Sequence, residues 1–150
     1  MDQASAGYLQ PPALDAPPPV VRGPRTTAWL LRILITLHAL AAIAQPVLAG
    51  AYLQGAFDAI GLHSGNAILV LLLCFFAALA AVPYWLRNGA GWPVLVLSAL
   101  WLAEGFQIGM GYALVLAVHV PLGVLVVGTA VALLIWAWSP ASRRPRKGAR

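Results

Sequence analysis

Residues 59–86 read AIGLHSGNAILVLLLCFFAALAAVPYWL, a run that contains no Asp, Glu, Lys or Arg. An α-helix rises about 1.5 Å per residue, so about 20 apolar residues cross the roughly 30 Å hydrocarbon core of a bilayer. This run is therefore long enough to span a membrane. Three further apolar blocks accompany it, and we predict membrane spans at residues 27–49, 59–86, 92–111 and 112–138.

The composition agrees with a membrane protein. Of the 150 residues, 61% are hydrophobic and 9% are charged, and the mean hydropathy is +0.85. A soluble domain carries about 25% charged residues, so an ordinary soluble globule is excluded. The net charge of +5 does not indicate a nucleic-acid partner, because most of the cations lie directly after the last apolar block, where membrane lipids are the expected partner.

The flanking residues predict the orientation. Residues 1–26 form a Pro-rich stretch, expected to be a disordered cytoplasmic tail, and residues 139–150 form a basic cytoplasmic tail. Arg87 lies between the second and third spans, whereas the other two connections carry no Lys or Arg. The positive-inside rule therefore places both termini and Arg87 in the cytoplasm. The predicted fold is an all-α, polytopic four-helix bundle built from two helical hairpins, in a bacterial plasma membrane.

Polar residues inside the spans are few, and each is costly in hydrocarbon without a partner. Counting from the predicted external ends places four of them in one layer: Gln45, His63, Gln107 and His119. Each hairpin contributes one Gln and one His to this layer. Glu104 lies about one turn deeper and His38 lies near mid-membrane. Cys74 is the single cysteine, so neither a disulfide nor a cysteine metal site is expected within one chain.

Two imidazoles brought together inside a bundle are typical of axial ligands to a haem iron. We therefore predict a haem b held by His63 and His119, with Gln45, Gln107, Glu104 or a backbone carbonyl accepting the second ring N–H of each ligand. A zinc or copper site is less well supported, since it needs a third ligand from His38 or Glu104. Packing alone also explains such residues, because His and Gln hydrogen-bond between membrane helices. For His38 and Glu104, a proton relay is a further alternative.

Four segments carry a resemblance to a known family: Gln45-Pro-Val-Leu-Ala-Gly50, Asp58-Ala-Ile-Gly-Leu-His63, Gln107-Ile-Gly-Met-Gly111 and His119-Val-Pro-Leu-Gly123. Together they resemble one four-helix half of the haem A synthase family, and they are similar to related small four-span proteins of high-GC bacteria. The likeness covers residues 28–138. In that family each half carries one His on its second helix and one on its fourth, which implies the same roles for His63 and His119.

Two departures from the family pattern bear on activity. The catalytic half of that family has an acidic residue three positions before the second-helix His, where this chain has Ile60, and an Arg commonly follows the His, where this chain has Ser64. We therefore expect haem binding for electron transfer or haem handling rather than an independent enzyme. The alternatives are a cofactor-free membrane subunit or scaffold and a small proton-coupled transporter module. A homodimer or a membrane redox partner is compatible with the small residues on the first and third spans.

Overall fold

The structure is a computed structural model that describes residues 24–146, and this part of the chain is helical without strands. Helix α1 comprises Arg25–Leu53, α2 comprises Ala59–Leu86, α3 comprises Trp92–Tyr112 and α4 comprises Leu116–Trp138. A short 3-10 helix, η1, follows at Pro140–Arg143. All four α-helices are long and apolar enough to cross a membrane. The predicted all-α multi-pass membrane bundle is thus confirmed.

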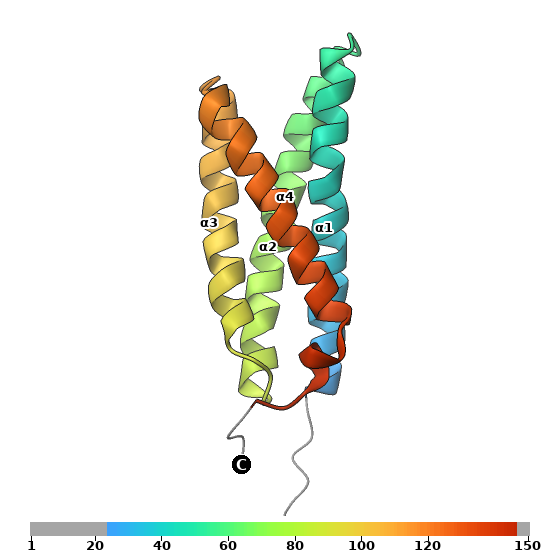
Figure 1. Ribbon diagram of the computed structural model, residues 1–150, viewed down its shortest axis with the longest axis vertical. Helices are drawn as coiled ribbons and strands as arrows, with labels where there is room; N and C mark the ends of the chain where they lie inside the picture. The colour runs from blue at the N-terminus through green and yellow to red at the C-terminus, as the bar shows by residue number, and fades with distance from the viewer. Residues whose placement is uncertain (1–23, 147–150) are drawn as a thin grey trace, which may run out of the picture.

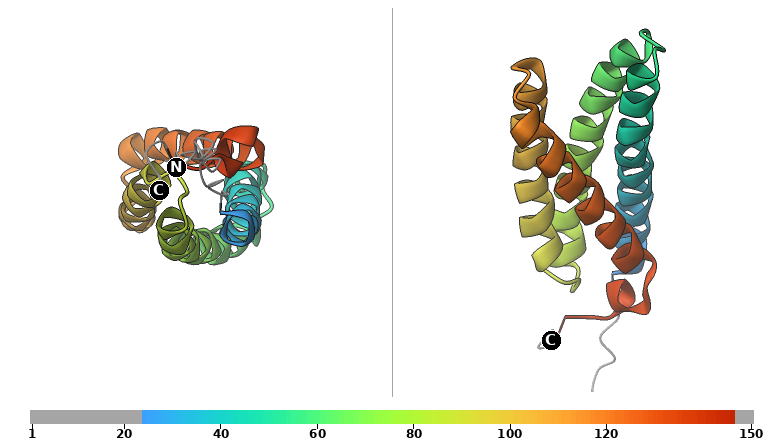
Figure 2. Two further views of the ribbon diagram at one scale, coloured as in Figure 1. Left: turned by 90° about the horizontal axis from the view of Figure 1, so that it is seen from below. Right: turned by 45° about the horizontal axis from the view of Figure 1, so that its top comes forward.

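The four helices run alternately in opposite directions around a square (Figures 1 and 2). Helix α1 contacts α2 and α4, and α3 contacts α2 and α4, so that α1 and α3 are diagonal to one another, as are α2 and α4. Helix α4 crosses the bundle obliquely: it begins beside α3 and ends beside α1 (Figure 1). The α1–α2 and α3–α4 hairpins consequently diverge toward the end at which α4 begins.

The two ends of the bundle differ in their chemistry. We call the end where α4 begins the imidazole end, because His63 and His119 lie there. The opposite end, which we call the arginine end, carries Arg25, Arg32 and Arg143. Five tryptophans also gather at the arginine end, at residues 29, 85, 92, 136 and 138, as in the aromatic belt of a membrane interface.

The packed core occupies the arginine half of the bundle. Buried side chains in α3 extend from Pro93 only as far as Glu104, and those in α4 begin at Val126. Many of the buried residues are alanines, whose small side chains allow membrane helices to approach closely. The imidazole end is less tightly packed, because its helices have already begun to diverge.

The predicted boundaries agree best for the second span, which matches α2 from end to end. Helix α1, which runs from Arg25 to Leu53, is longer than the span predicted at 27–49. The turn between α3 and α4 lies later than predicted: α3 continues through Tyr112, and α4 begins only at Leu116. The turn depends on Leu114, whose φ of 56° is left-handed, and not on the nearby glycines.

The two predicted tails lie partly outside the described residues, which exclude 1–23 and 147–150. Within the described part of the basic tail, η1 returns to the bundle and Ser142 is buried against it. The beginning of this segment therefore belongs to the folded structure.

Candidate cofactor site

His63 of α2 and His119 of α4 face one another across a diagonal of the square. Their ring centroids are 6.2 Å apart and their ring planes are inclined by 61°. Both side chains are partly buried. Since the backbones of α2 and α4 make no close approach within residues 24–146, these two imidazoles reach across the interior of the bundle.

The same hydrogen bond orients both imidazoles. Nδ1 of His63 donates to the backbone carbonyl of Gln45 over 3.1 Å, and Nδ1 of His119 donates to that of Gln107 over 2.9 Å. Each bond joins the two helices of one hairpin. A proton on Nδ1 leaves the lone pair on Nε2, and neither Nε2 has a hydrogen-bond partner among the described residues. Both rings therefore have an unprotonated Nε2 that is free to coordinate a metal.

The two glutamine side chains complete a reciprocal pairing. Nε2 of Gln107 donates to the backbone carbonyl of His119 over 3.3 Å. With the nitrogen and oxygen of its amide exchanged, Gln45 donates to the carbonyl of His63 over 3.1 Å and accepts from the Ala67 N–H over 3.0 Å. In that orientation the Gln45 nitrogen also lies 3.0 Å from Nδ1 of His63. We assign the Nδ1 proton to the carbonyl bond, because the same arrangement recurs at His119.

Two glycines keep room for this pairing in the second hairpin. A Cβ atom at Gly111 would lie 2.9 Å from Cε1 of His119, and one at Gly123 would lie 2.6 Å from Nε2 of Gln107. Real Cβ atoms essentially never make contacts this short, so a side chain at either position would shift the imidazole or its glutamine. The two glycines thus leave the space that His119 and Gln107 occupy.

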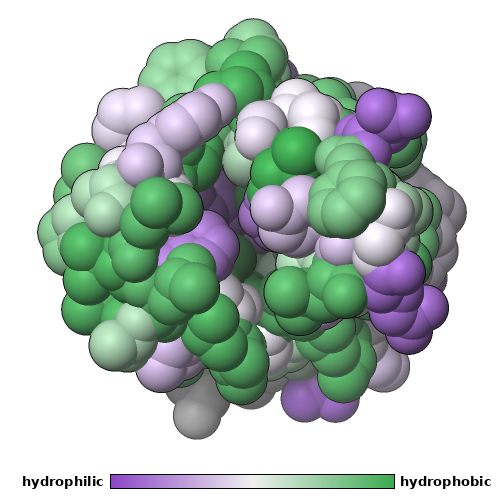
Figure 3. Space-filling model, turned by 90° about the horizontal axis from the view of Figure 1, so that it is seen from above, coloured by the Kyte–Doolittle hydropathy of each residue, from purple (hydrophilic) through white to green (hydrophobic). Residues whose placement is uncertain are grey.

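The imidazole end is hollowed between the two hairpins. Figure 3, which looks down on this end, shows a depression between the α1–α2 and α3–α4 hairpins with hydrophilic surface inside it. The surrounding surface is mostly apolar in the same view. A polar recess with an apolar rim at this end is typical of a binding site within a membrane bundle.

A second polar group lies on the other diagonal, deeper in the bundle. Nε2 of His38 in α1 lies 2.7 Å from Oε1 of Glu104 in α3, and their side chains are 0% and 2% exposed. Either residue donates in this hydrogen bond, depending on which one holds the proton. Nδ1 of His38 and Oε2 of Glu104 are buried without hydrogen-bond partners among the described residues. This pair connects α1 and α3 through the centre of the bundle.

Cys74 of α2 adjoins this pair. One ligand atom each from His38, Cys74 and Glu104 lies within 4.8 Å of the others, which is close enough for a metal ion to be considered. The thiol nevertheless donates to the carbonyl of Leu97 over 3.5 Å, and one nitrogen of His38 is already bonded to Glu104. His38 and Glu104 are therefore hydrogen-bonded to each other, whereas Cys74 lies beside them and is hydrogen-bonded to Leu97.

The structure divides the six predicted site residues into two layers. Gln45, His63, Gln107 and His119 come together at the imidazole end, whereas His38 and Glu104 pair with each other below them. The sequence did not indicate that Cys74 lies beside His38 and Glu104, because its position in an apolar run does not show which helix faces it. The buried Arg32, whose side chain is only 2% exposed, is also absent from the predicted site residues.

No family model, curated protein or solved structure matches this chain. The resemblance to the haem A synthases accordingly rests on the four motifs in the sequence, and what the site can bind is inferred from the geometry of the two layers.

Proposed function

We propose that the imidazole end binds one haem b between His63 and His119, and that the protein carries electrons to or from a membrane partner or takes part in haem handling. The observation that carries this proposal is the pair of facing imidazoles 6.2 Å apart, each with Nδ1 bonded to a carbonyl and Nε2 available.

The spacing of the rings supports two ligands on one metal. Two imidazoles that bind one metal from opposite sides, each with a metal–nitrogen bond of about 2 Å, would have ring centres about 6 Å apart. The rings of His63 and His119 already have this separation. A zinc ion would require two further ligands to complete a tetrahedron, whereas a haem iron needs only the two axial nitrogens. The donor set therefore fits haem better than zinc.

A haem b bound at this site supplies one-electron redox chemistry at its iron. The chain contributes the surroundings that tune this chemistry. His63 and His119 would both hold the haem iron, and a site with two histidine ligands would favour electron transfer over oxygen chemistry. The carbonyls of Gln45 and Gln107 hold the imidazoles in one tautomer and one orientation.

The orientation in the membrane determines from which side a redox partner would reach the haem. With the positive-inside arrangement, the imidazole end faces the outside of the cell. The hollow at this end would then admit an external or membrane-bound redox partner to the edge of the cofactor. Right-side-out vesicles should accordingly allow a reductant that does not cross the membrane to reduce the haem.

The colour of the protein tests the proposal. Membranes from cells that overproduce the chain with an ample haem supply should show a Soret band, and the purified protein should retain one haem per chain. An empty vector and a His63→Ala, His119→Ala double variant at matched expression serve as controls. Colourless wild-type protein would contradict haem binding and would favour the alternative of a cofactor-free membrane subunit or scaffold.

A second candidate function, proton transfer, is favoured by the His38–Glu104 pair. Two buried polar atoms of this pair lack partners among the described residues, which is costly and is typical of groups that exchange protons. A proton-coupled module would move protons into vesicles that contain the purified protein and a pH-sensitive dye. Glu104→Gln should abolish this flux, and an equal flux with Glu104→Gln would exclude the function.

A further inference from the structure

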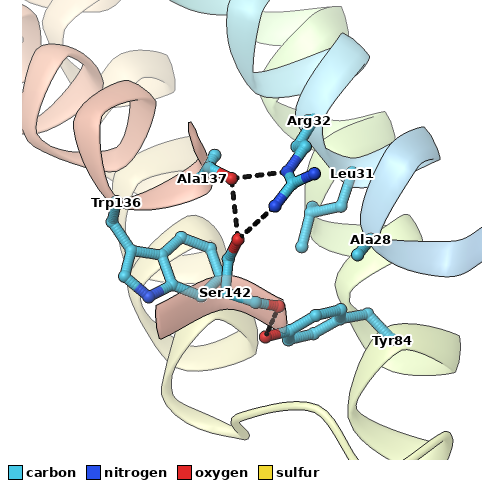
Figure 4. Close-up of a pocket in the computed structure, with 7 residues that line it drawn as sticks. All are labelled: Ala28, Leu31, Arg32, Tyr84, Trp136, Ala137 and Ser142. Atoms are coloured by element: carbon cyan, nitrogen blue, oxygen red, sulfur yellow. Dashed lines mark hydrogen bonds between the residues drawn. The ribbon is translucent and has the colours of Figure 1, made fainter. Parts of the chain in front are cut away.

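The arginine end contains a buried cation whose protein partners are all neutral. Nε of Arg32 donates to the carbonyl of Ala137 over 2.6 Å, and Nη2 donates to Oγ of Ser142 over 2.7 Å (Figure 4). Oγ of Ser142 in turn donates to the Ala137 carbonyl over 2.7 Å, and Tyr84 donates its hydroxyl to the carbonyl of Ser142 over 3.0 Å. Arg32 thereby joins α1 to the end of α4 and to η1.

These contacts leave part of the guanidinium unused. An arginine has five N–H donors, and the hydrogen bonds of Arg32 account for one on Nε and one on Nη2. The rings of Trp29 and Trp138 lie 5.3 and 5.6 Å from its Cζ, and they offer cation–π contact without a negative charge. No carboxylate pairs with Arg32 among residues 24–146. The positive charge is thus buried, 2% exposed, without an anionic partner in the part of the chain that the structure describes.

A cavity of about 290 Å³ adjoins this guanidinium. It is lined by Arg25, Ala28, Trp29, Arg32 and Arg143, so three arginines from the start of α1 and from η1 surround one space. Helix α1 also begins here without an acidic residue in its first turn and without a side-chain cap. Its first free N–H groups and the positive end of its dipole therefore add to the attraction for an anion.

The depth of the cavity indicates which anion reaches it. Helix α1 has 29 residues, and its length of about 44 Å matches the full thickness of a bilayer with its headgroups. Arg32 lies about 10 Å along the helix from Arg25, which is close to the boundary between headgroups and hydrocarbon. Phosphate groups of lipids lie on the water side of this boundary, between the levels of Arg25 and Arg32, and exposed Trp29 is of the residue type that prefers this region.

We propose that this cavity is a specific binding site for the phosphate group of an anionic phospholipid. Arg32 provides the deep, preoriented donors, and Arg25 and Arg143 close on the phosphate from the water side. Arginine suits this role because its planar donors match phosphate oxygens. The site is separate from the imidazole end and does not depend on haem.

Native mass spectrometry of the purified full-length chain tests the proposal. The protein is titrated with phosphatidylglycerol, with zwitterionic phosphatidylcholine of the same chains and with inorganic phosphate alone. We expect one phosphatidylglycerol to bind more tightly than phosphatidylcholine by about tenfold, and inorganic phosphate not to displace it. Arg143→Gln should weaken this binding by about fivefold, because one charge near the phosphate is lost.

The neighbouring arginine supplies a matched control. Arg144→Gln removes the same charge one residue further along, and Arg144 does not line the cavity. It should leave the tight phosphatidylglycerol site unchanged. Equal weakening by both variants would mean only general attraction to a basic tail and would overturn the proposal. Displacement of the lipid by inorganic phosphate would instead identify free phosphate as the source of the bound group.

Arg32→Gln tests the deep part of the site. It should abolish the tight binding, provided that circular dichroism shows an intact helical bundle. If Arg32→Gln fails to fold, the comparison of Arg143→Gln with Arg144→Gln still tests the proposed lipid site. Both of these side chains are exposed, and neither belongs to the buried core.

Discussion

Single side chains determine whether this bundle can hold a cofactor. The imidazoles of His63 and His119 have the same hydrogen-bonded surroundings, although they come from different hairpins. His38 is a useful contrast: it is also a histidine within a span, but its Nε2 is engaged by Glu104. The availability of Nε2, rather than the presence of a histidine, therefore distinguishes the two proposed ligands.

Removing one proposed ligand should change the coordination of the iron. His63→Ala and His119→Ala should each lose haem or leave it five-coordinate, because only one axial nitrogen remains. The absorption spectrum of protein reconstituted with haem measures this change. His38→Ala is the control and should keep the six-coordinate spectrum. The reverse pattern, with His38 essential and His63 dispensable, would show that the ligand lies in the deeper layer and would contradict the proposed site.

Substitution of a glycine beside His119 should also change the affinity for haem. Gly111→Ala places a Cβ 2.9 Å from Cε1 of His119 and should turn the ring, which lowers the affinity for haem by about tenfold. Gly109→Ala on the same helix has no atom within 4 Å of the added Cβ and should leave the affinity unchanged. Haem titration of both variants provides the measurement. Equal affinities would show that the position of His119 does not control binding.

At the scale of the helices, polar contacts join the diagonals that the backbones do not bridge. The imidazole pair faces across from α2 to α4, and the His38–Glu104 pair connects α1 to α3. The buried hydrogen bond between His38 and Glu104 specifies that α1 and α3 are opposite one another, a choice that an apolar surface alone leaves open in lipid.

Breaking the deeper pair should destabilise the bundle. Glu104→Ala leaves Nε2 of His38 buried without a partner, which should lower the free energy of unfolding by about 1–3 kcal/mol. Glu104→Gln should cost less, because its amide still hydrogen-bonds to the imidazole. Unfolding in mixed detergent micelles, followed by circular dichroism, compares the variants. An unchanged midpoint for Glu104→Ala would mean that the pair contributes nothing to stability.

The sequence predicted the helices better than their contacts. The span at 59–86 agrees with α2, since apolar length alone defines it, and residue counting placed Gln45, His63, Gln107 and His119 in one layer. The α3–α4 turn was less predictable, because Gly111 accommodates His119 instead of making the turn. The pairing of His38 with Glu104 was not foreseen, since depth along a helix does not reveal which residues lie on one diagonal.

At the scale of the whole molecule, one end of the bundle carries the two imidazoles and the other carries the arginines. The orientation in the membrane decides which end faces the cytoplasm. Reporter fusions at Arg87 and after the C-terminus should both report the cytoplasm, because the flanking arginines favour that side. A fusion at Gly61 should report the outside. An external C-terminus would reverse the proposed placement of the imidazole end or show that the number of spans differs in the membrane.

Electron paramagnetic resonance of the ferric protein, purified with its haem, tests the central claim most directly. Two imidazole ligands impose a strong axial field, so the account predicts a low-spin signal with no high-spin component, and predicts that His63→Ala and His119→Ala each remove it. A high-spin signal from wild-type protein, or a low-spin signal that survives both substitutions, would contradict a haem held between His63 and His119.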